Sequence, residues 1–346
     1  MHKPENILIT GGSGFLGTHL IRFLNQRGYH IRATFNSRIP SSSTINQIEW
    51  IKVRNISSPE SWDDLIKGAD YIIHLIGRAH VFKESSPEDL IKFREANVLS
   101  TQALAESCVH SGNKIKKFVF MSSVSAVCSS STQPINEQSP CYPETTYGKS
   151  KLEAENVLKD TLQHKISWCI LRPTMIYGPA DPGNMGRLIK LIKLGIPLPL
   201  KNVRNARNFL YIGNFLEIMG RVLSHNNADF KTYLVADDES VSTPELIRII
   251  AEILNKKAMV FPFPAAMLGL MGKVGSFLER NLNISIGINN YSVDRLTNSL
   301  VIDNSFIKHD LDFEMPYSFY EGIRQTVNYD KLKVGSNECF NRRGSS

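Results

Sequence analysis

The stretch Asn6-Ile-Leu-Ile-Thr-Gly-Gly-Ser-Gly-Phe-Leu-Gly17 decides the fold of this chain. A short apolar run, Ile7–Ile9, ends in glycines, and a helical pattern of apolar residues begins at Phe15. A strand followed by a tight turn and a helix places the free N–H groups and partial positive charge of the helix N-terminus where an anion binds. From Gly12 to Gly17 the spacing is G-x-G-x-x-G, which is typical of turns that hold a dinucleotide pyrophosphate. The sequence therefore predicts a dinucleotide site at its N-terminus.

Composition and charge exclude several functional classes. The chain has 346 residues, of which 42% are hydrophobic and 21% charged, as in ordinary globular proteins. Its formal net charge of +7 is spread along the chain instead of being clustered, which argues against a nucleic-acid partner and favours an anionic small molecule. The five cysteines are scattered and form no C-x-x-C pair, so we expect no disulfide framework, no metal site and a reducing, cytoplasmic location.

One apolar stretch, Met259–Leu278, raises the question of a membrane segment. It is interrupted by Pro262, Pro264 and Lys273, so it predicts an amphipathic helix over the second lobe and no stable membrane insertion. Contact with a membrane surface is the minority alternative.

The first half of the chain alternates strand-like and helix-like segments. Strands are expected at 7–10, 30–35, 48–53, 71–75, 118–122 and 167–171, and helical patterns lie between them. This alternation predicts an α/β fold with a doubly wound parallel (Rossmann) sheet over residues 1–173. Glycine and proline clusters then introduce a smaller mixed α/β C-terminal substrate lobe over 174–330, and 331–346 is expected to be a disordered tail.

Tyr147 and Lys151 form the main candidate for chemistry. Four residues apart at the start of a predicted helix, they share one face. A free tyrosine has a pKa of about 10, and a neighbouring ammonium stabilises the phenolate and lowers that pKa. The pair can therefore move a proton at an alcohol oxygen while hydride moves at carbon. Serines at 122, 123 and 125 lie at the end of a predicted strand and can hydrogen-bond the same oxygen.

Several motifs occur in the order found in one family. They are the glycine turn, Asp70-Tyr-Ile-Ile-His-Leu75, Asn97-Val98, Ser122-Ser123, Tyr147-x-x-x-Lys151 and Arg172-Pro-Thr-Met-Ile-Tyr-Gly-Pro179. Over residues 5–330 the chain resembles the extended short-chain dehydrogenase/reductases, specifically the nucleotide-sugar epimerase/dehydratase group.

This resemblance implies roles for individual residues. Tyr147 is the expected acid/base, Lys151 the residue that tunes its pKa and anchors the ribose, and Ser123 the catalytic hydroxyl, with Ser122 and Ser125 as alternatives because the spacing to Val127 is unusual. Expected cofactor contacts are Gly11, Gly14, Phe15, Leu16, Gly17, Asn55, Ile56, Leu75, Asn97, Tyr147, Lys151 and Pro173. Expected substrate contacts are Ser125, Tyr177, Asn184, Arg207 and Arg295. Arg207 is expected to bind the diphosphate. The alternative for each arginine is an ion pair on the surface.

The chain departs from the family pattern where NAD-specific members carry a carboxylate. Phe35 stands at that position, and no acidic residue occurs between Gly17 and Glu49. A carboxylate there would repel a 2′-phosphate, and its absence, with Arg32, Asn36 and Arg38 nearby, favours NADP, with NAD as the alternative.

Within the group, residues 183–200 most resemble enzymes that act at C4 of UDP-N-acetylhexosamines in surface-polysaccharide (O-antigen) pathways. The resemblance favours a 4-ketoreductase of the kind that forms UDP-N-acetylquinovosamine, working as a homodimer through segments 87–111 and 146–163. A UDP-glucose or UDP-N-acetylglucosamine 4-epimerase that retains its NAD is the first alternative. A non-catalytic dinucleotide sensor is the second, and the intact Tyr147 and Lys151 argue against it.

Overall fold

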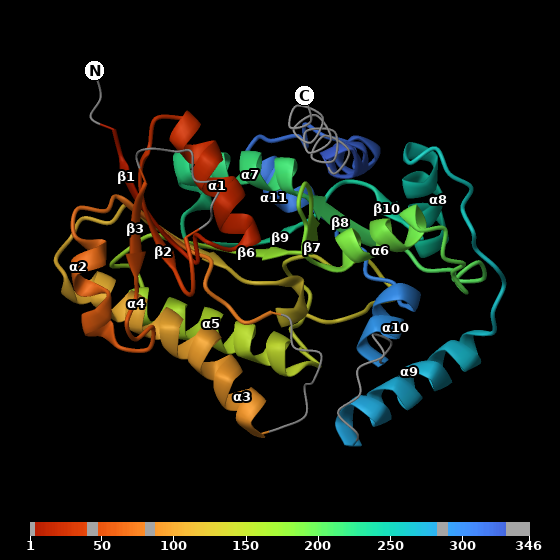
Figure 1. The fold of residues 1–346 in the computed structure, drawn as a ribbon. Helices are drawn as coiled ribbons and strands as arrows, with labels where there is room; N and C mark the ends of the chain where they lie inside the picture. Colours follow the sequence, from red (N-terminus) through yellow and green to blue (C-terminus); the bar gives the residue numbers. More distant parts are fainter. Residues whose placement is uncertain (1–3, 40–47, 80–86, 282–289, 330–346) are drawn as a thin grey trace, which may run out of the picture.

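A seven-stranded parallel sheet forms the first lobe of the protein (Figure 1). The computed structural model describes residues 4–39, 48–79, 87–281 and 290–329. In the order β3-β2-β1-β4-β5-β6-β9, the strands are β3 (Glu49–Lys52), β2 (His30–Phe35), β1 (Asn6–Thr10), β4 (Tyr71–His74), β5 (Lys117–Met121), β6 (Trp168–Pro173) and β9 (Lys231–Val235). The strand order reverses between β1 and β4, so their carboxyl ends flank the position where doubly wound sheets bind ligands. The predicted fold class is confirmed.

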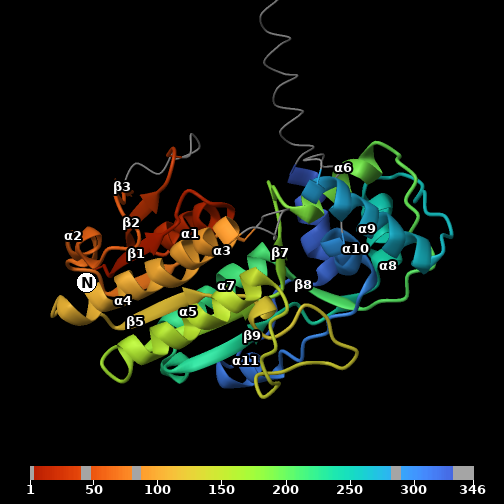
Figure 2. The same ribbon diagram turned by 90° about the horizontal axis from the view of Figure 1, so that it is seen from below.

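Helices cover both faces of this sheet (Figures 1 and 2). On one side lie α1 (Phe15–Gln26), α7 (Ile212–Ser224) and α11 (Ser305–Asp310). On the other lie α3 (Pro87–Arg94), a π-helical turn η2 (Glu95–Leu99), α4 (Ser100–His110) and α5 (Thr146–Leu162), while the short α2 (Asp63–Ile66) precedes β4. Because both faces are covered, β5 is buried at every residue, as expected for a central parallel strand.

The second lobe is built on a three-stranded sheet in the order β10-β8-β7. Its strands are β7 (Met175–Tyr177), β8 (Arg207–Tyr211) and β10 (Ser240–Val241), with α6 (Asn184–Lys193), α8 (Thr243–Ile253), α9 (Ala265–Asn281) and α10 (Asn290–Thr297) around them. The predicted boundary at residue 173 coincides with the end of β6. However, β9, α7 and α11 return to the first lobe, because the apolar strand β9 pairs with β6 along its whole length.

No helix among the described residues is long and apolar enough to cross a membrane. Residues 265–278 of the predicted amphipathic segment lie in α9, whereas 259–264 are not helical, and the predicted tail at 331–346 lies outside the described residues.

The glycine turn between β1 and α1 is fixed by backbone geometry. Gly11 has a φ of +70°, which residues other than glycine rarely adopt. The N–H of Gly12 donates to the carbonyl of Thr34 at 2.9 Å, which ties the turn to the end of β2. A Cβ on Gly17 would lie 2.6 Å from backbone atoms of Gly11 and Gly12, so only glycine fits there.

Gly17→Ala is expected to destabilise the protein by about 1–3 kcal/mol, because the added methyl group must displace backbone in a packed turn. Gly269→Ala in α9 is the matched control, since its Cβ would meet nothing within 4 Å and alanine is the better helix former. Urea unfolding of both variants measures the difference. Equal stability of the two would contradict the packing described for the turn.

Candidate active site

Lys151 lies buried at the carboxyl edge of the large sheet. Its Nζ donates a hydrogen bond of 2.7 Å to the carbonyl of Met121, the last residue of β5, and lies 4.7 Å from the centroid of the Phe120 ring. Burial lowers the pKa of Lys151 to about 8, and the carboxylate of Glu155, one turn further along α5, partly opposes this shift. The ammonium is thus buried between a backbone carbonyl and an aromatic ring.

Tyr147 is the second residue of the same helix, one turn before Lys151. Thr145 caps this helix, because its side chain accepts from the N–H of Gly148 at 3.0 Å. The ring of Tyr147 is partly exposed and lies 6.3 Å from the ring of Phe93, measured between centroids. Tyr147 and Lys151 thus lie one turn apart near the start of α5, so their side chains leave the helix on the same face.

Gly77 makes room for this ammonium, and the sequence analysis missed it. A Cβ on Gly77 would lie 3.0 Å from Nζ of Lys151 and 3.2 Å from Oδ1 of Asn97. The signal was present as a glycine three residues after His74, just beyond a predicted strand. The next residue, Arg78, places its guanidinium 5.7 Å from the Phe93 ring centroid and pairs with Asp89 at 3.4 Å.

Asn97 fastens these elements together. Its Oδ1 accepts from the N–H of Arg78 at 2.8 Å, and its Nδ2 donates to Oγ of Ser150 at 2.8 Å and to the carbonyl of Arg78 at 3.3 Å. The buried amide lies in the π-helical turn η2, a type of turn that is frequent at functional sites. These bonds occupy the amide, so we assign Asn97 to positioning the loop after β4 against α5.

A buried histidine extends this network to the glycine turn. Nδ1 of His74 lies 2.7 Å from Oγ1 of Thr10, and its Nε2 lies 3.1 Å from Oγ1 of Thr101. Because Thr101 donates its hydroxyl to the carbonyl of Asn97, it accepts from Nε2, and Nδ1 accepts from Thr10. Burial and the Lys151 charge lower the pKa of His74 to about 3, so the ring is neutral. Thr10, the residue before the glycine turn, is therefore linked to Asn97 through His74 and Thr101.

The structure separates the three candidate serines. Ser122 is buried and its hydroxyl donates to Glu155, which also receives Arg172 in a buried ion pair of 2.6 Å. Ser123 is only half-buried, and its Oγ accepts from the N–H of Ser125 at 3.2 Å, which leaves its hydroxyl hydrogen to donate. The carbonyl of Ser125 packs directly on Gly148 beside Tyr147. Ser123 and Ser125 thus remain candidates near Tyr147, while Ser122 holds the Glu155–Arg172 pair.

The dinucleotide side of the site fits a pyrophosphate. No side chain caps the N-terminus of α1 and no acidic residue lies in its first turn, so its N–H groups are open to an anion. Gly11, Gly14 and Gly17 shape the turn, and Phe15 and Leu16 begin the helix, with Phe15 facing the loop at Gly178. Leu75 follows β4 and Pro173 ends β6 at the same edge.

The expected adenosine contacts lie after β2 and β3. Asn36 and Arg38 are exposed just beyond β2, and Phe35 packs edge-on against Trp50. After β3, the exposed Asn55 accepts from the N–H of Ser57 at 3.0 Å, and the carbonyl of Ile56 accepts from the indole of Trp62. Among the described residues, the end of β2 carries no carboxylate.

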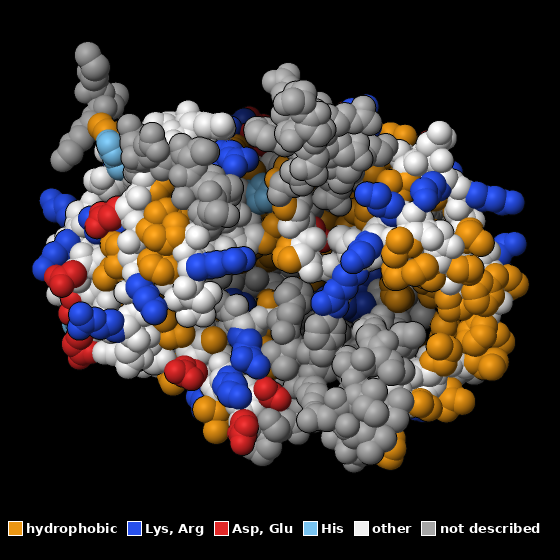
Figure 3. Space-filling view, viewed as in Figure 1, with side chains coloured by type: hydrophobic (Ala, Val, Ile, Leu, Met, Phe, Trp, Pro, Cys, Tyr) orange, Lys and Arg blue, Asp and Glu red, His pale blue; other side chains and the backbone are white. Residues whose placement is uncertain are grey.

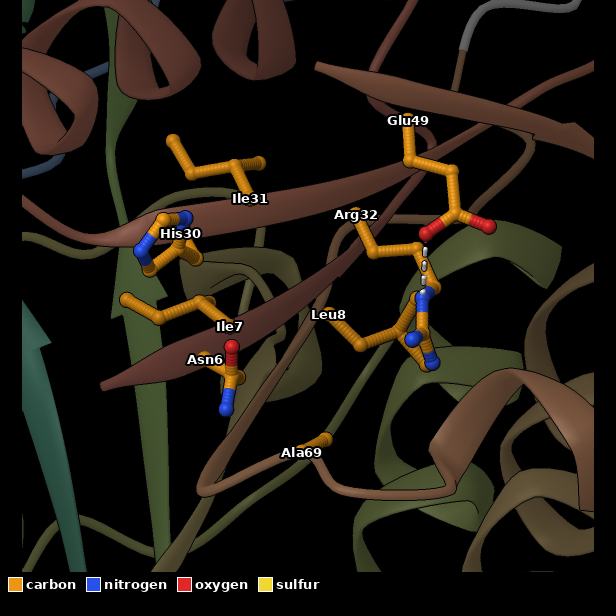
Figure 4. Close-up of a pocket in the computed structure, with 8 residues that line it drawn as sticks. All are labelled: Asn6, Ile7, Leu8, His30, Ile31, Arg32, Glu49 and Ala69. Atoms are coloured by element: carbon orange, nitrogen blue, oxygen red, sulfur yellow. Dashed lines mark hydrogen bonds and ion pairs between the residues drawn. The ribbon is translucent and has the colours of Figure 1, made fainter. Parts of the chain in front are cut away.

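Arg32 does not join this group. It lies three residues before the end of β2, where its Nε pairs with Glu49 at 3.1 Å and its Nη1 donates to the carbonyl of Leu65 at 2.6 Å. Figure 4 shows it lining a hollow beside the first half of β1 and β2, together with Asn6, Leu8 and Glu49. The guanidinium is satisfied away from the carboxyl edge, so the structure corrects the expectation that Arg32 contacts the cofactor.

Tyr177 also differs from its predicted role. It is fully buried in an aromatic cluster with Phe209, Tyr211 and Phe319, and its hydroxyl donates to the carbonyl of Phe319 at 3.3 Å. With no exposed surface it cannot touch a substrate. We assign it to the core of the second lobe.

The other expected substrate contacts lie in the second lobe. Arg207 begins β8 and donates to the carbonyl of Asn298 at 2.8 Å. Asn298 directly follows α10, the helix that carries Arg295. The bond between Arg207 and Asn298 brings the two segments together, and both arginines are partly exposed. Asn184 begins α6, where Asp181, missed by the sequence analysis, accepts from the N–H groups of Gly183 and Gly186.

Comparisons with known proteins agree with this architecture. The model of the NAD dependent epimerase/dehydratase family matches residues 7–236. A UDP-glucose 4-epimerase of Vibrio cholerae is 30% identical over 94% of this chain and 95% of its own length. An N-acetyl-α-D-glucosaminyl-diphospho-ditrans,octacis-undecaprenol 4-epimerase of Escherichia coli O157:H7 is 26% identical, with the same coverage.

Solved structures show the same fold. A UDP-glucose 4-epimerase of Thermotoga maritima with UDP-glucose superposes with a TM-score of 0.75 at 20% identity, covering 95% of this chain and 99% of that one. A UDP-glucuronic acid 4-epimerase of Bacillus cereus in complex with NAD gives 0.74 at 21% identity, covering 94% and 96%. Both lobes are therefore shared with these structures.

The lowered pKa of Lys151 predicts a pH-dependent stability. Below pH 8 the buried Lys151 is charged, and its burial lowers the free energy of unfolding by the full amount. As pH rises from about 8 to 10.5, the ordinary pKa of lysine, the unfolded chain binds more protons than the folded protein, and the free energy of unfolding therefore rises. Lys151→Met removes this dependence. Its stability relative to the wild type should fall by up to about 3 kcal/mol between pH 7 and pH 10.5. Urea unfolding across that range measures it, and a difference that does not change with pH would contradict the burial of the charge.

Proposed function

We propose that this chain, which belongs to the NAD dependent epimerase/dehydratase family, is a nucleotide-sugar 4-epimerase that transiently oxidises C4 of its substrate. The observation that supports the proposal is a buried Lys151 at the carboxyl edge, one turn after Tyr147 on α5 and at the same sheet edge as a glycine turn fit for a pyrophosphate. The V. cholerae and E. coli relatives support it, because both are 4-epimerases and are matched across both lobes.

The residues present divide the chemistry between them. The glycine turn and the N-terminus of α1 hold the dinucleotide pyrophosphate, and a bound nicotinamide supplies the means of accepting and returning hydride at C4. Tyr147 takes the proton of the C4 hydroxyl during oxidation and returns it during reduction. The Lys151 ammonium stabilises the phenolate form, and a hydroxyl from Ser123 steadies the reacting oxygen. In the second lobe, Arg207 contacts the substrate diphosphate, with Arg295 as a second arginine on the neighbouring helix.

A 4-ketoreductase is the second candidate function, and one observation favours it. The end of β2 has Phe35 and the exposed Arg38 but no carboxylate among the described residues, which suits a 2′-phosphate and hence NADPH. A reductase must exchange its cofactor at each turnover, whereas an epimerase regenerates it. The retained Tyr147 and Lys151 weigh against a non-catalytic sensor, which has no chemical need for them.

The reaction test uses purified protein without added cofactor. We expect it to interconvert UDP-glucose or UDP-N-acetylglucosamine and the C4 epimer, followed by NMR, with NAD released on denaturation and identified by mass spectrometry. Tyr147→Phe should retain cofactor but lose about 10²–10⁴-fold in rate, as expected for a lost acid/base. An enzyme that epimerises neither sugar but reduces UDP-4-keto-6-deoxy-N-acetylglucosamine with added NADPH would replace the epimerase proposal with the ketoreductase.

The serine assignment has its own test. Ser123→Ala should lower kcat with little change in unfolding temperature, because the role proposed for its hydroxyl is a hydrogen bond to the reacting oxygen. Ser122→Ala should instead cost about 1.5–3 kcal/mol in stability, since it removes a hydrogen bond to a buried carboxylate. Thermal unfolding and steady-state kinetics of both variants decide the matter. The assignment fails if Ser122→Ala loses turnover and Ser123→Ala does not.

A further inference from the structure

Helix α9 packs onto the protein with two glycines and one leucine, and most of its large apolar residues face outward. Gly272, Gly275 and Leu268 are buried, and the helix lies against α10. On the opposite face, the side chains of Met267, Leu270, Met271, Val274 and Phe277 are 38–61% exposed. These positions recur every three or four residues, so they form one continuous stripe. A surface helix in a globular protein normally has the reverse arrangement.

The stripe continues onto neighbouring segments. Met259 and Phe261 are exposed just before α9, and the N–H of Phe261 donates to the carbonyl of Leu198 at 3.1 Å. Leu194 and Ile196, which follow α6, are exposed as well. Figure 3 shows hydrophobic side chains gathered over this part of the second lobe, with Lys and Arg beside them. We call this area the α9 face.

The segments that form most of the α9 face are rich in Lys and Arg, although Glu279 and Arg280 lie in the last turn of α9. Residues 182–216 contain six Lys and Arg and residues 253–278 contain three, and neither segment contains Asp or Glu. The contacts place several of these cations at the face. Lys256 donates to the carbonyl of Lys193, and the N–H of Lys201 donates to the carbonyl of Phe261. Lys273 is exposed within α9 itself.

We propose that the α9 face binds the surface of an anionic lipid bilayer. A helix that carries bulky apolar side chains on one face and is bordered by Lys lies in the interface, where the apolar groups enter the headgroup boundary and the ammonium groups meet phosphates. Each Lys or Arg near an anionic surface strengthens binding by about fivefold. The charge pattern selects a bilayer over a second copy of this chain, because two copies of the face would bring these cations together. This inference concerns a surface and is independent of the proposed reaction.

Sedimentation with vesicles tests the proposal. We expect the full-length protein to bind vesicles of phosphatidylglycerol and phosphatidylethanolamine, to bind phosphatidylcholine vesicles weakly, and to be released by high salt. Leu270→Glu or Phe277→Glu should weaken binding by about tenfold or more. Lys273→Glu should weaken it by about fivefold or more.

Matched controls lie elsewhere on the surface. Phe306→Glu on α11 and Lys165→Glu after α5 alter exposed residues outside the α9 face and should bind vesicles as the wild type does. Circular dichroism confirms that all variants fold. The proposal is overturned if the wild type does not bind anionic vesicles, or if the α9 variants bind as well as the controls. It is also overturned if sedimentation velocity shows a wild-type dimer that Leu270→Glu dissociates without affecting lipid binding, since the face then belongs to a second copy.

Discussion

The burial of one ammonium group organises this site. A cation at Lys151 can be taken out of water only where polar groups receive it, and the structure provides the carbonyl of Met121 at 2.7 Å and the carboxylate of Glu155 one turn away. A Cβ on Gly77 would crowd this group, because it would lie 3.0 Å from Nζ. Asn97 then holds the loop that contains Gly77, and His74 links that arrangement to Thr10, the residue before the glycine turn. The glycine turn and the surroundings of Lys151 are thus joined by one set of buried contacts.

Much of this could be predicted because it is local in sequence. The glycine turn and the Tyr147–Lys151 pair are each determined by spacing within one element, and the alternation of strands and helices defines the sheet. The errors came from long-range packing. Arg32 is neutralised by Glu49 on a neighbouring strand, and Tyr177 is buried by Phe319, 142 residues away. Likewise, only the fold shows that Glu155, 33 residues later, takes up the hydroxyl of Ser122.

The burial of Lys151 at the sheet edge does not by itself identify the reaction. The sheet edge and the buried lysine fit any reaction in which hydride and proton leave one carbinol, so they do not choose between an epimerase and a reductase. That choice depends on how long the cofactor stays bound and on whether the returning hydride meets the other face of the sugar. Two regions bear on this choice. At the end of β2, Phe35 packs on Trp50 in place of a carboxylate contact. In the second lobe, Arg207 bonds the carbonyl of Asn298, which follows the helix that carries Arg295.

The central claim is that hydride leaves C4 of the sugar under the control of Tyr147. The most direct measurement is a rapid-mixing experiment that follows the absorbance of reduced nicotinamide after the enzyme meets UDP-glucose or UDP-N-acetylglucosamine carrying deuterium at C4 or at C5. The account predicts that the nicotinamide is reduced more slowly with the C4 label and at the normal rate with the C5 label. Reduction that is unaffected by deuterium at C4 and slowed by deuterium at another carbon would contradict it.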